Sequence, residues 1–380
     1  MRAMRFRLTT FICFHVLVIS VFVRGQGVAH GVDIESENPR QGAIVSAVAT
    51  PPSQPVSGPG GSTYLHKSVT RSGKIGKGAL AYYLFEPAQP VPKKAPVIVL
   101  NHGYAGVDPV GYGGWINHMV KRGNIVIYPV FQAGLYTSRF KLSGNAIQGV
   151  KDALKELQSG QHVQPDTNRF ALVGHSAGGI ITANMAATWK AQGLPKPRAV
   201  MCVQAGISRM FPLADLSLIA KDTLLLSVAG DNDRVTGLKD SKLIIQRATN
   251  VPDANKNYVV LQSDTYGSPD IRATHLLSIS VLEEDIKAAS AAKYRLRALF
   301  LKDAKGKPVK DNAKLKAEMW TDGLDYFGTW KLFDGLCDAA FYGKHREYAL
   351  GNTAKQRFMG KWSDGRAVRE LVVEKLPAAP

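Results

Sequence analysis

Cysteine is scarce in this sequence: there are three among 380 residues, and one of them, Cys13, lies inside an apolar N-terminal run. A small fold held together by disulfides is therefore excluded, because such folds carry many cysteines in a short chain. Cys202 follows an apolar pattern typical of a strand, and Cys337 lies in a helical pattern. The sequence leaves open whether these two cysteines pair or remain buried thiols.

The glycine-rich segments lack the spacing of a phosphate-binding loop. The pattern Gly-x-x-x-x-Gly-Lys-Ser/Thr is missing from 72–78, and the glycines of 111–114 follow a loop instead of a strand. The histidines outside the motifs described below also lack a second ligand at the spacing of a metal site. These absences argue against nucleotide-driven and metal-dependent chemistry, and we expect no metal.

Acidic residues are outnumbered, with 30 Asp and Glu against 48 Lys and Arg and a net charge of +18. Four arginines belong to the N-terminal leader described next, so the rest of the chain carries about +14. A nucleic-acid partner would require clustered basic residues within a recognisable binding motif, whereas here they are scattered. We interpret the charge as general surface character and expect no nucleic-acid partner.

Long hydrophobic runs are also missing, except for one near the N-terminus. Three arginines lie within Met1–Arg7, Leu8–Val23 is almost uninterrupted in its apolar character, and small and polar residues follow. This layout predicts a signal peptide over residues 1–28 and a secreted or periplasmic protein, although no clean cleavage site marks its end. An uncleaved membrane anchor remains the alternative, because sixteen apolar residues are slightly short for a membrane span.

The rest of the chain divides by composition. Residues 29–62 are rich in proline, glycine and serine and predict a flexible linker. Over 63–300, short apolar runs alternate with helical patterns, which predicts an α/β catalytic domain with a doubly wound, mostly parallel sheet and helices on both faces. Residues 301–380 predict a helical extension packed on the same domain. The expected strands are 64–69, 79–85, 97–100, 125–130, 170–173, 199–203, 223–228 and 258–261, and the expected helices are 115–121, 146–157, 177–190 and 238–247.

The strongest chemical signal is Gly174-His175-Ser176-Ala177-Gly178, which matches Gly-x-Ser-x-Gly between an expected strand and an expected helix. In this context the turn holds the serine in a strained conformation at the tip of the strand, and the two glycines leave room for neighbouring backbone. The N-terminus of the following helix favours negative charge on a substrate oxygen. We predict that Ser176 is a nucleophile.

A serine nucleophile of this type has an acid and a histidine at the ends of later strands, in that order along the chain. Asp231 and Asp233 both follow the strand expected at 223–228, and we prefer Asp233 because Asp231 is better placed to fix the turn. His275 is the one histidine between residue 261 and residue 344. We therefore predict Ser176, Asp233 and His275 as the catalytic residues.

An oxyanion requires two backbone N–H donors, one directly after the nucleophile and one from the loop that follows the strand at 97–100. Ala177 fills the first position, and Tyr104 fills the second because Gly103 lets the backbone turn inward. The ring of Tyr104 would form a wall against the substrate. We expect Tyr104 and His175 to bind substrate.

At these residues the chain resembles the α/β-hydrolase superfamily, and within it the chlorophyllase-like, dienelactone-hydrolase-like and cutinase-type polyester hydrolases. The likeness spans roughly residues 63 to 290 and rests on the segments at 102–104, 174–179, 230–233 and 274–275. It implies hydrolysis of carboxylic esters through an acyl-enzyme, with no metal or organic cofactor and with Asp233 as the acid. It does not identify the ester, for which we expect a small-molecule or lipid-like substrate.

Two questions stay open at this point. The same serine chemistry could serve an acyltransferase, a thioesterase or a peptidase, or the fold could be kept in a binding protein without activity. After His275 the chain continues for about a hundred residues, unlike compact cutinase-type enzymes, and this extension is either a lid over the site or part of the core. Its aromatic residues are Trp320, Tyr326, Phe327, Trp330, Phe333, Phe341 and Tyr342.

Overall fold

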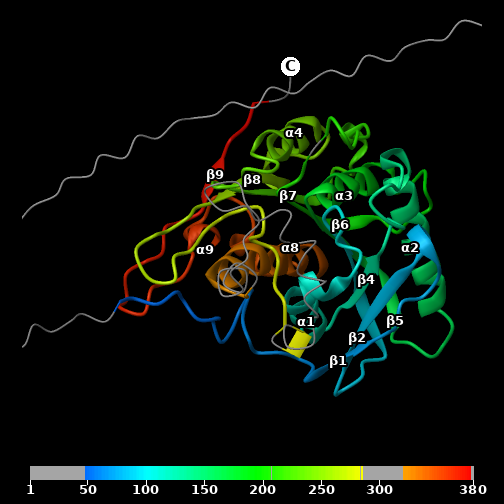
Figure 1. The fold of residues 1–380 in the computed structure, drawn as a ribbon, viewed down its shortest axis with the longest axis horizontal. Coiled ribbons are helices and arrows are strands. Elements are labelled where there is room, and N and C mark those ends of the chain that lie inside the picture. The colour runs from blue at the N-terminus through cyan, green and yellow to red at the C-terminus, as the bar shows by residue number, and fades with distance from the viewer. Residues whose placement is uncertain (1–47, 207, 283, 286–319, 378–380) are drawn as a thin grey trace, which may run out of the picture. The chain divides into compact units, whose positions relative to one another are not determined.

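The computed structural model describes residues 48–377 except 207, 283 and 286–319, so the predicted signal peptide lies outside the described residues. The described strands form one sheet in the order β1-β2-β4-β3-β5-β6-β7-β8-β9 (Figure 1). Strands β4, β3, β5, β6, β7 and β8 run parallel, and the outer strands pair antiparallel. The strands are β1 (Ser68–Arg71), β2 (Tyr82–Ala88), β3 (Lys94–Asn101), β4 (Ile125–Pro129), β5 (Gln164–His175), β6 (Pro197–Val203), β7 (Leu224–Gly230), β8 (Lys256–Leu261) and β9 (Val372–Glu374).

Helices cover both faces of this sheet. Along β3, Val97 and Val99 face one hydrophobic cluster, and Ile98 and Leu100 face the other, because successive side chains of a strand point to opposite faces. Helices α2, α3 and α4 pack on the first face, and α1 and α8 pack on the second (Figure 1). The helices are α1 (Gly113–Lys121), α2 (Leu142–Leu157), α3 (Ala177–Thr188), α4 (Lys239–Arg247), α8 (Lys331–Tyr342) and α9 (Ala354–Arg357). The predicted doubly wound α/β class is confirmed.

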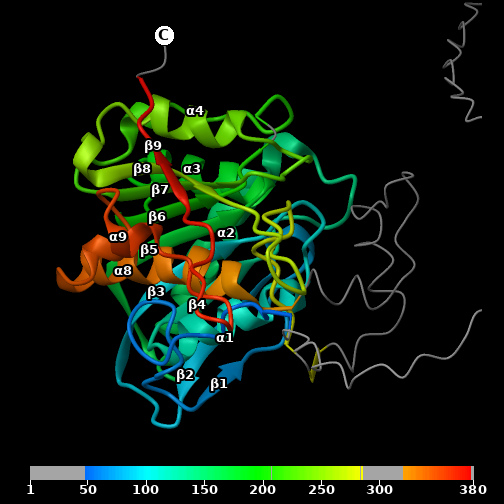
Figure 2. The ribbon, with the colours of Figure 1, turned by 90° about the vertical axis from the view of Figure 1, so that its left-hand side faces the viewer.

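The C-terminal extension contributes to the core where the structure describes it. A π-helix, Leu324–Trp330, leads into α8, and the side chains of Trp330 and Phe333 are buried against the sheet. The extension also supplies β9, a strand absent from the predicted pattern, which pairs antiparallel with β8 at the sheet edge (Figure 2). Trp330 and Phe333 therefore serve as core residues, whereas Trp320 and Tyr342 are about half exposed. The described part of the extension is not purely helical.

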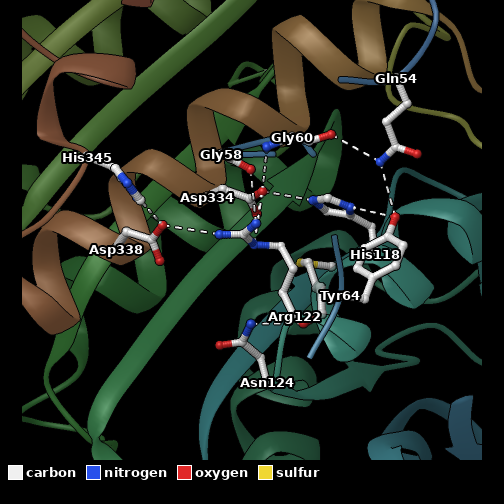
Figure 3. Close-up of polar contacts among 11 residues, drawn as sticks. Gln54, Gly58, Gly60, Tyr64, His118, Arg122, Asn124, Asp334, Asp338 and His345 are labelled. Carbon is white, nitrogen blue, oxygen red and sulfur yellow. Dashed lines mark hydrogen bonds and ion pairs between the residues drawn. The ribbon is translucent and has the colours of Figure 1, made fainter. Parts of the chain in front are cut away.

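The predicted flexible linker needs a correction. The part of it that the structure describes, 48–62, is fixed to the fold, since the Gly60 amide donates to the carboxylate of Asp334, 274 residues away, at 2.7 Å. Gly60 has φ +80°, and a Cβ there would lie 2.1 Å from the Tyr326 carbonyl oxygen, so this close approach requires glycine. Gln54 donates to the Gly60 carbonyl at 3.0 Å and to the Tyr64 hydroxyl at 3.1 Å (Figure 3). We call residues 48–64 the N-terminal arm.

A buried ionic cluster joins this arm to α1 and α8 (Figure 3). Around Asp334 of α8 lie His118 Nε2 at 2.8 Å and Arg122 Nε at 3.2 Å, and the Tyr64 hydroxyl of the arm lies 3.1 Å from His118 Nδ1. Burial acts to raise the pKa of Asp334, but Arg122 and His118 outweigh it and the pKa is lowered. The carboxylate is therefore charged, and its partners come from two segments far from it in the sequence, the N-terminal arm and the end of α1.

The structure answers whether the two cysteines pair and whether a described helix could span a membrane. Cys202 in β6 and Cys337 in α8 are both buried and unpaired. Burial raises the pKa of the Cys202 thiol to about 12, so it is protonated and unreactive. Within the described part of the chain, no helix has the length and apolar character needed to cross a membrane.

Candidate active site

Ser176 lies at the sharp turn between β5 and α3. Its backbone has φ 57° and ψ −123°, a strained conformation for a residue with a side chain. A Cβ on Gly174 would lie 2.2 Å from the Gly178 carbonyl oxygen, and a Cβ on Gly178 would lie 2.1 Å from that of Asn101. Both glycines are therefore required by close backbone approach, and the serine stands half-buried at the carboxyl end of the parallel strands.

The structure brings Ser176, His275 and Asp233 together. His275 Nε2 lies 3.0 Å from Ser176 Oγ, and His275 Nδ1 lies 2.9 Å from Asp233 Oδ2. The competing Asp231 faces elsewhere, since it accepts from the amide and hydroxyl of Ser263 at 2.9 Å and 2.6 Å. Because a carboxylate can only accept, Nδ1 carries the imidazole proton and Nε2 is left to accept the serine proton.

Asp233 is held as a carboxylate. Its side chain is fully buried, and Oδ1 accepts from the amides of Val235 and Thr236 at 2.8 Å and 3.0 Å, while the Thr236 hydroxyl donates to Oδ2 at 2.7 Å. Burial acts to raise the pKa of Asp233, but His275 and Thr236 lower it to about 2. A charged, fixed acceptor therefore orients the His275 ring.

The backbone next to Ser176 offers two N–H groups. Neither the Tyr104 amide nor the Ala177 amide donates to another residue that the structure describes. Ala177 is the first residue of α3, so its amide is one of those that a helix leaves without an internal partner. A Cβ on Gly103 would lie 3.4 Å from the Ser176 Cβ, which places the backbone just before Tyr104 against the serine.

The Tyr104 side chain is fixed beside the same loop. Its hydroxyl donates to the Leu135 carbonyl, and its ring centroid lies 6.0 Å from that of Phe211. The ring therefore bridges the loop after β4 and the loop after β6, at the edge of the sheet where Ser176 lies. This position suits the wall that the sequence predicts, and contact with substrate remains a prediction.

Comparison with family models agrees with this fold and site. A model described as α/β hydrolase fold matches residues 143–293, a range that contains Ser176, Asp233 and His275. A model described as chlorophyllase matches residues 81–204, which contain Tyr104 and Ser176. The chain belongs to the α/β-hydrolase superfamily. The two matches together also support the chlorophyllase-like branch, and a comparison with curated proteins found no match.

His175 of this α/β hydrolase has a different setting from the one that the sequence predicts. The ring is buried, and both nitrogens have protein partners: Nε2 lies 2.9 Å from the His275 carbonyl oxygen, and Nδ1 lies 2.9 Å from the Tyr112 hydroxyl. Burial and the neighbouring His275 lower the pKa of His175 to about 3, so the ring is neutral. Substrate contact is disfavoured by this burial, and the geometry gives His175 a positioning role instead.

Tyr112 completes a connected set of hydrogen bonds that the sequence did not reveal. The His275 carbonyl requires a proton on His175 Nε2, which leaves Nδ1 to accept from the Tyr112 hydroxyl. The same hydroxyl accepts from the Gly103 amide at 2.8 Å. This set, which we call the positioning network, links the loop of Tyr104 to the backbone of His275 through Gly103, Tyr112 and His175.

Gln204 is a second residue that the sequence analysis missed. It follows β6 with a positive φ of 47°, it is buried, and its side-chain amide donates to the Thr274 carbonyl at 2.5 Å. Its backbone carbonyl oxygen lies 3.1 Å from the Thr236 hydroxyl, whose proton points to Asp233. Gln204 thus connects the segments that carry His275 and Asp233. Among the described residues, no three His, Cys, Asp or Glu side chains gather as a metal site.

Proposed function

We propose that this α/β hydrolase cleaves carboxylic esters through a covalent acyl-enzyme on Ser176. The observation that supports this most directly is the continuous set of hydrogen bonds from Ser176 Oγ through His275 to Asp233, beside two backbone amides at the serine. Serine is a weak nucleophile without an adjacent base, and this arrangement supplies one. The superfamily match is consistent with hydrolysis.

The proposed reaction follows from these positions. His275 Nε2 takes the proton of Ser176 Oγ as the oxygen attacks the ester carbonyl carbon, and the amides of Tyr104 and Ala177 donate to the oxyanion. His275 then returns the proton to the departing alcohol, which leaves the acyl group on Ser176. A water molecule then attacks the acyl carbonyl carbon in the same way, with His275 as the base, and the carboxylic acid leaves Ser176. Asp233 stabilises the imidazolium formed in both halves.

The proposed substrates are small or medium acyl esters, or lipid-like esters. The match to a chlorophyllase model is consistent with an ester substrate, and the Tyr104 ring beside the site favours an apolar one. Because the chain begins with an apolar run behind three arginines, we also propose that it acts after export, in the periplasm or outside the cell.

Hydrolysis of p-nitrophenyl esters of increasing acyl length tests this proposal. The wild type should release p-nitrophenol, and its rate should depend on chain length. Ser176→Ala and His275→Ala should each lower kcat by about 10⁴-fold or more, because these residues act as one unit. Full activity in Ser176→Ala, or no hydrolysis by well-folded wild type with any ester, would contradict the proposal.

A further inference from the structure

Three loops around Ser176 each expose an apolar side chain next to an arginine. The loop after β4 carries Arg139 and Phe140, which is 72% exposed, and the guanidinium lies 5.2 Å from the centre of that ring. The loop after β6 carries the exposed Arg209 beside Met210, which is 42% exposed. The loop after β7 repeats the pairing once more. We call these three loops, residues 131–141, 208–212 and 234–239, the basic–apolar face.

The third pair is Arg234, which is exposed, and Val235, which is 44% exposed. This pair directly follows Asp233, and the Thr236 hydroxyl of the same loop lies 3.1 Å from the backbone carbonyl oxygen of Gln204 in the loop after β6. The carboxyl ends of parallel strands meet at one edge of a sheet, so the three loops share the edge that holds Ser176. The three exposed pairs therefore lie along the same edge of the sheet.

Direct contacts join the other two loops. Tyr104 donates to the Leu135 carbonyl of the loop after β4 and packs beside Phe211 of the loop after β6. Asn184 of α3 connects the loop after β6 to the start of α2, which directly follows the loop after β4, with its amide nitrogen 3.2 Å from the Ser143 hydroxyl and 3.0 Å from the Pro212 carbonyl. These contacts, together with the one between Thr236 and Gln204, connect all three loops of the basic–apolar face.

The composition of this face is unusual for an ordinary solvated surface. Tyr136 is fully exposed, and Leu135 beside it is half exposed. Neither of these large apolar side chains packs into the core. Exposed apolar residues that gather in one place mark an interaction site. The segments 131–141, 208–212 and 234–239 contain five basic residues and no acidic one, and the nearest acid along the second loop is Asp215, which accepts from Ser217.

We propose that the basic–apolar face docks on an anionic lipid surface. A bilayer interface offers both partners at once, because apolar tips can enter the acyl region while the neighbouring arginines bind headgroup phosphates. A nucleic acid would match the charge but not Leu135, Met210 and Val235, and a protein partner would not require a cation beside every apolar tip. The positive charge of the whole chain adds long-range attraction to an anionic membrane. Docking in this way would turn Ser176 toward the lipid.

Vesicle binding tests this surface separately from the proposed chemistry, since a Ser176→Ala chain can be used throughout. The chain is expressed with its own N-terminus, so every variant shares the same leader or its remnant. Co-sedimentation is measured with vesicles of phosphatidylglycerol and phosphatidylcholine in equal parts, and with phosphatidylcholine alone. We expect binding to the anionic vesicles, little binding to the neutral ones, and weaker binding as salt rises.

Charge removal on the face should have a graded effect. Each basic residue near an anionic membrane strengthens binding about fivefold, so Arg139→Gln, Arg209→Gln and Arg234→Gln together should weaken the partition coefficient about a hundredfold. Tyr136→Ser with Phe140→Ser should weaken it about tenfold while retaining the salt dependence. Circular dichroism and thermal unfolding establish that each variant is folded.

The matched controls lie at the opposite edge of the sheet, where the parallel strands begin. They remove the same charge and similar apolar area from exposed positions: Lys93→Gln, Lys151→Gln and Lys155→Gln for charge, and Leu65→Ser with Val91→Ser for apolar area. These variants should bind as the parent does. Equal loss in the controls, equal binding to neutral vesicles, or no vesicle binding by folded parent protein would overturn the proposal, as would binding to heparin but not to vesicles.

Discussion

Replacing Tyr112 by phenylalanine tests whether the positioning network supports the reaction. The hydroxyl is the one group that the Gly103 amide and His175 Nδ1 share, at 2.8 Å and 2.9 Å. Phenylalanine retains the ring, so the change removes these hydrogen bonds with little loss of packing. Both partners are buried, and water cannot readily replace the hydroxyl.

The size of the effect follows from the two partners left behind. A buried donor or acceptor without a partner costs about 1–3 kcal/mol, so the loss of two should lower the free energy of unfolding by about 2–6 kcal/mol. Complete loss of one oxyanion donor costs about 10²–10³ in kcat. Tyr112→Phe displaces the loop of Tyr104 without deleting its amide, and we expect kcat to fall about tenfold with KM little changed.

The assay combines urea unfolding with kcat and KM for p-nitrophenyl butyrate. Tyr258→Phe is the matched control, because Tyr258 is also buried but its hydroxyl has no hydrogen-bond partner among the described residues. That variant should keep both stability and kcat. If Tyr112→Phe loses stability but keeps the wild-type kcat, the network supports the fold alone. If it loses neither, the reasoning from these hydrogen bonds is wrong.

Three other predictions follow from single contacts. Asp233→Asn should lower kcat by about 10³–10⁴-fold, because the amide no longer holds the required His275 tautomer. Asp231→Asn, a change at the neighbouring acid of the same turn, should alter kcat less than about threefold. Equal losses of kcat in the two variants would contradict the assignment of Asp233 as the catalytic acid. The pKa of Asp233 is lowered from its ordinary value of 3.8 to about 2 in the folded chain. Between these two pH values the unfolded chain binds one more proton than the folded chain, so the free energy of unfolding falls by about 2 kcal/mol as the pH is lowered through this range. Acid titration of unfolding should show this slope in wild type and not in Asp233→Asn. Asp334→Asn should lower the free energy of unfolding by about 3–5 kcal/mol, because it removes the buried carboxylate that Arg122, His118 and the Gly60 amide share. Asp222→Asn at a surface ion pair should cost less than about 1 kcal/mol, and urea unfolding of both variants distinguishes them.

Much of this fold could be predicted from local pattern. The buried parallel strands appear in the sequence as short runs of Val, Ile and Leu, because both of their faces are covered. The glycines of the Ser176 turn are required by the backbone itself, so the motif identifies its own geometry. The order of serine, acid and histidine along the chain restricts the acid to Asp231 or Asp233, and Asp233 could be preferred because Asp231 is better placed to fix the turn.

Other features depend on contacts that no local pattern contains. The N-terminal arm has the composition of a linker, and what fixes it is a carboxylate 274 residues away. Strand β9 has three residues and forms only by pairing with β8. Burial of His175 depends on Tyr112 and on the His275 backbone, 100 residues apart from it. In each case the decisive partner is distant in sequence, and spacing alone does not identify it.

Trapping the acyl-enzyme tests the central claim most directly. Rapid mixing of the purified chain with excess p-nitrophenyl butyrate, acid quenching and peptide mass spectrometry should show a burst of p-nitrophenol and a butyryl group on the peptide that contains Ser176, provided that deacylation is the slower step. A fluorophosphonate, which mimics the tetrahedral intermediate and does not deacylate readily, should label the same serine whichever step is slower. Labelling at Ser176 in wild type, and its loss in His275→Ala, is the predicted result. Ester hydrolysis with no label at Ser176, or with label at another residue, would contradict the account.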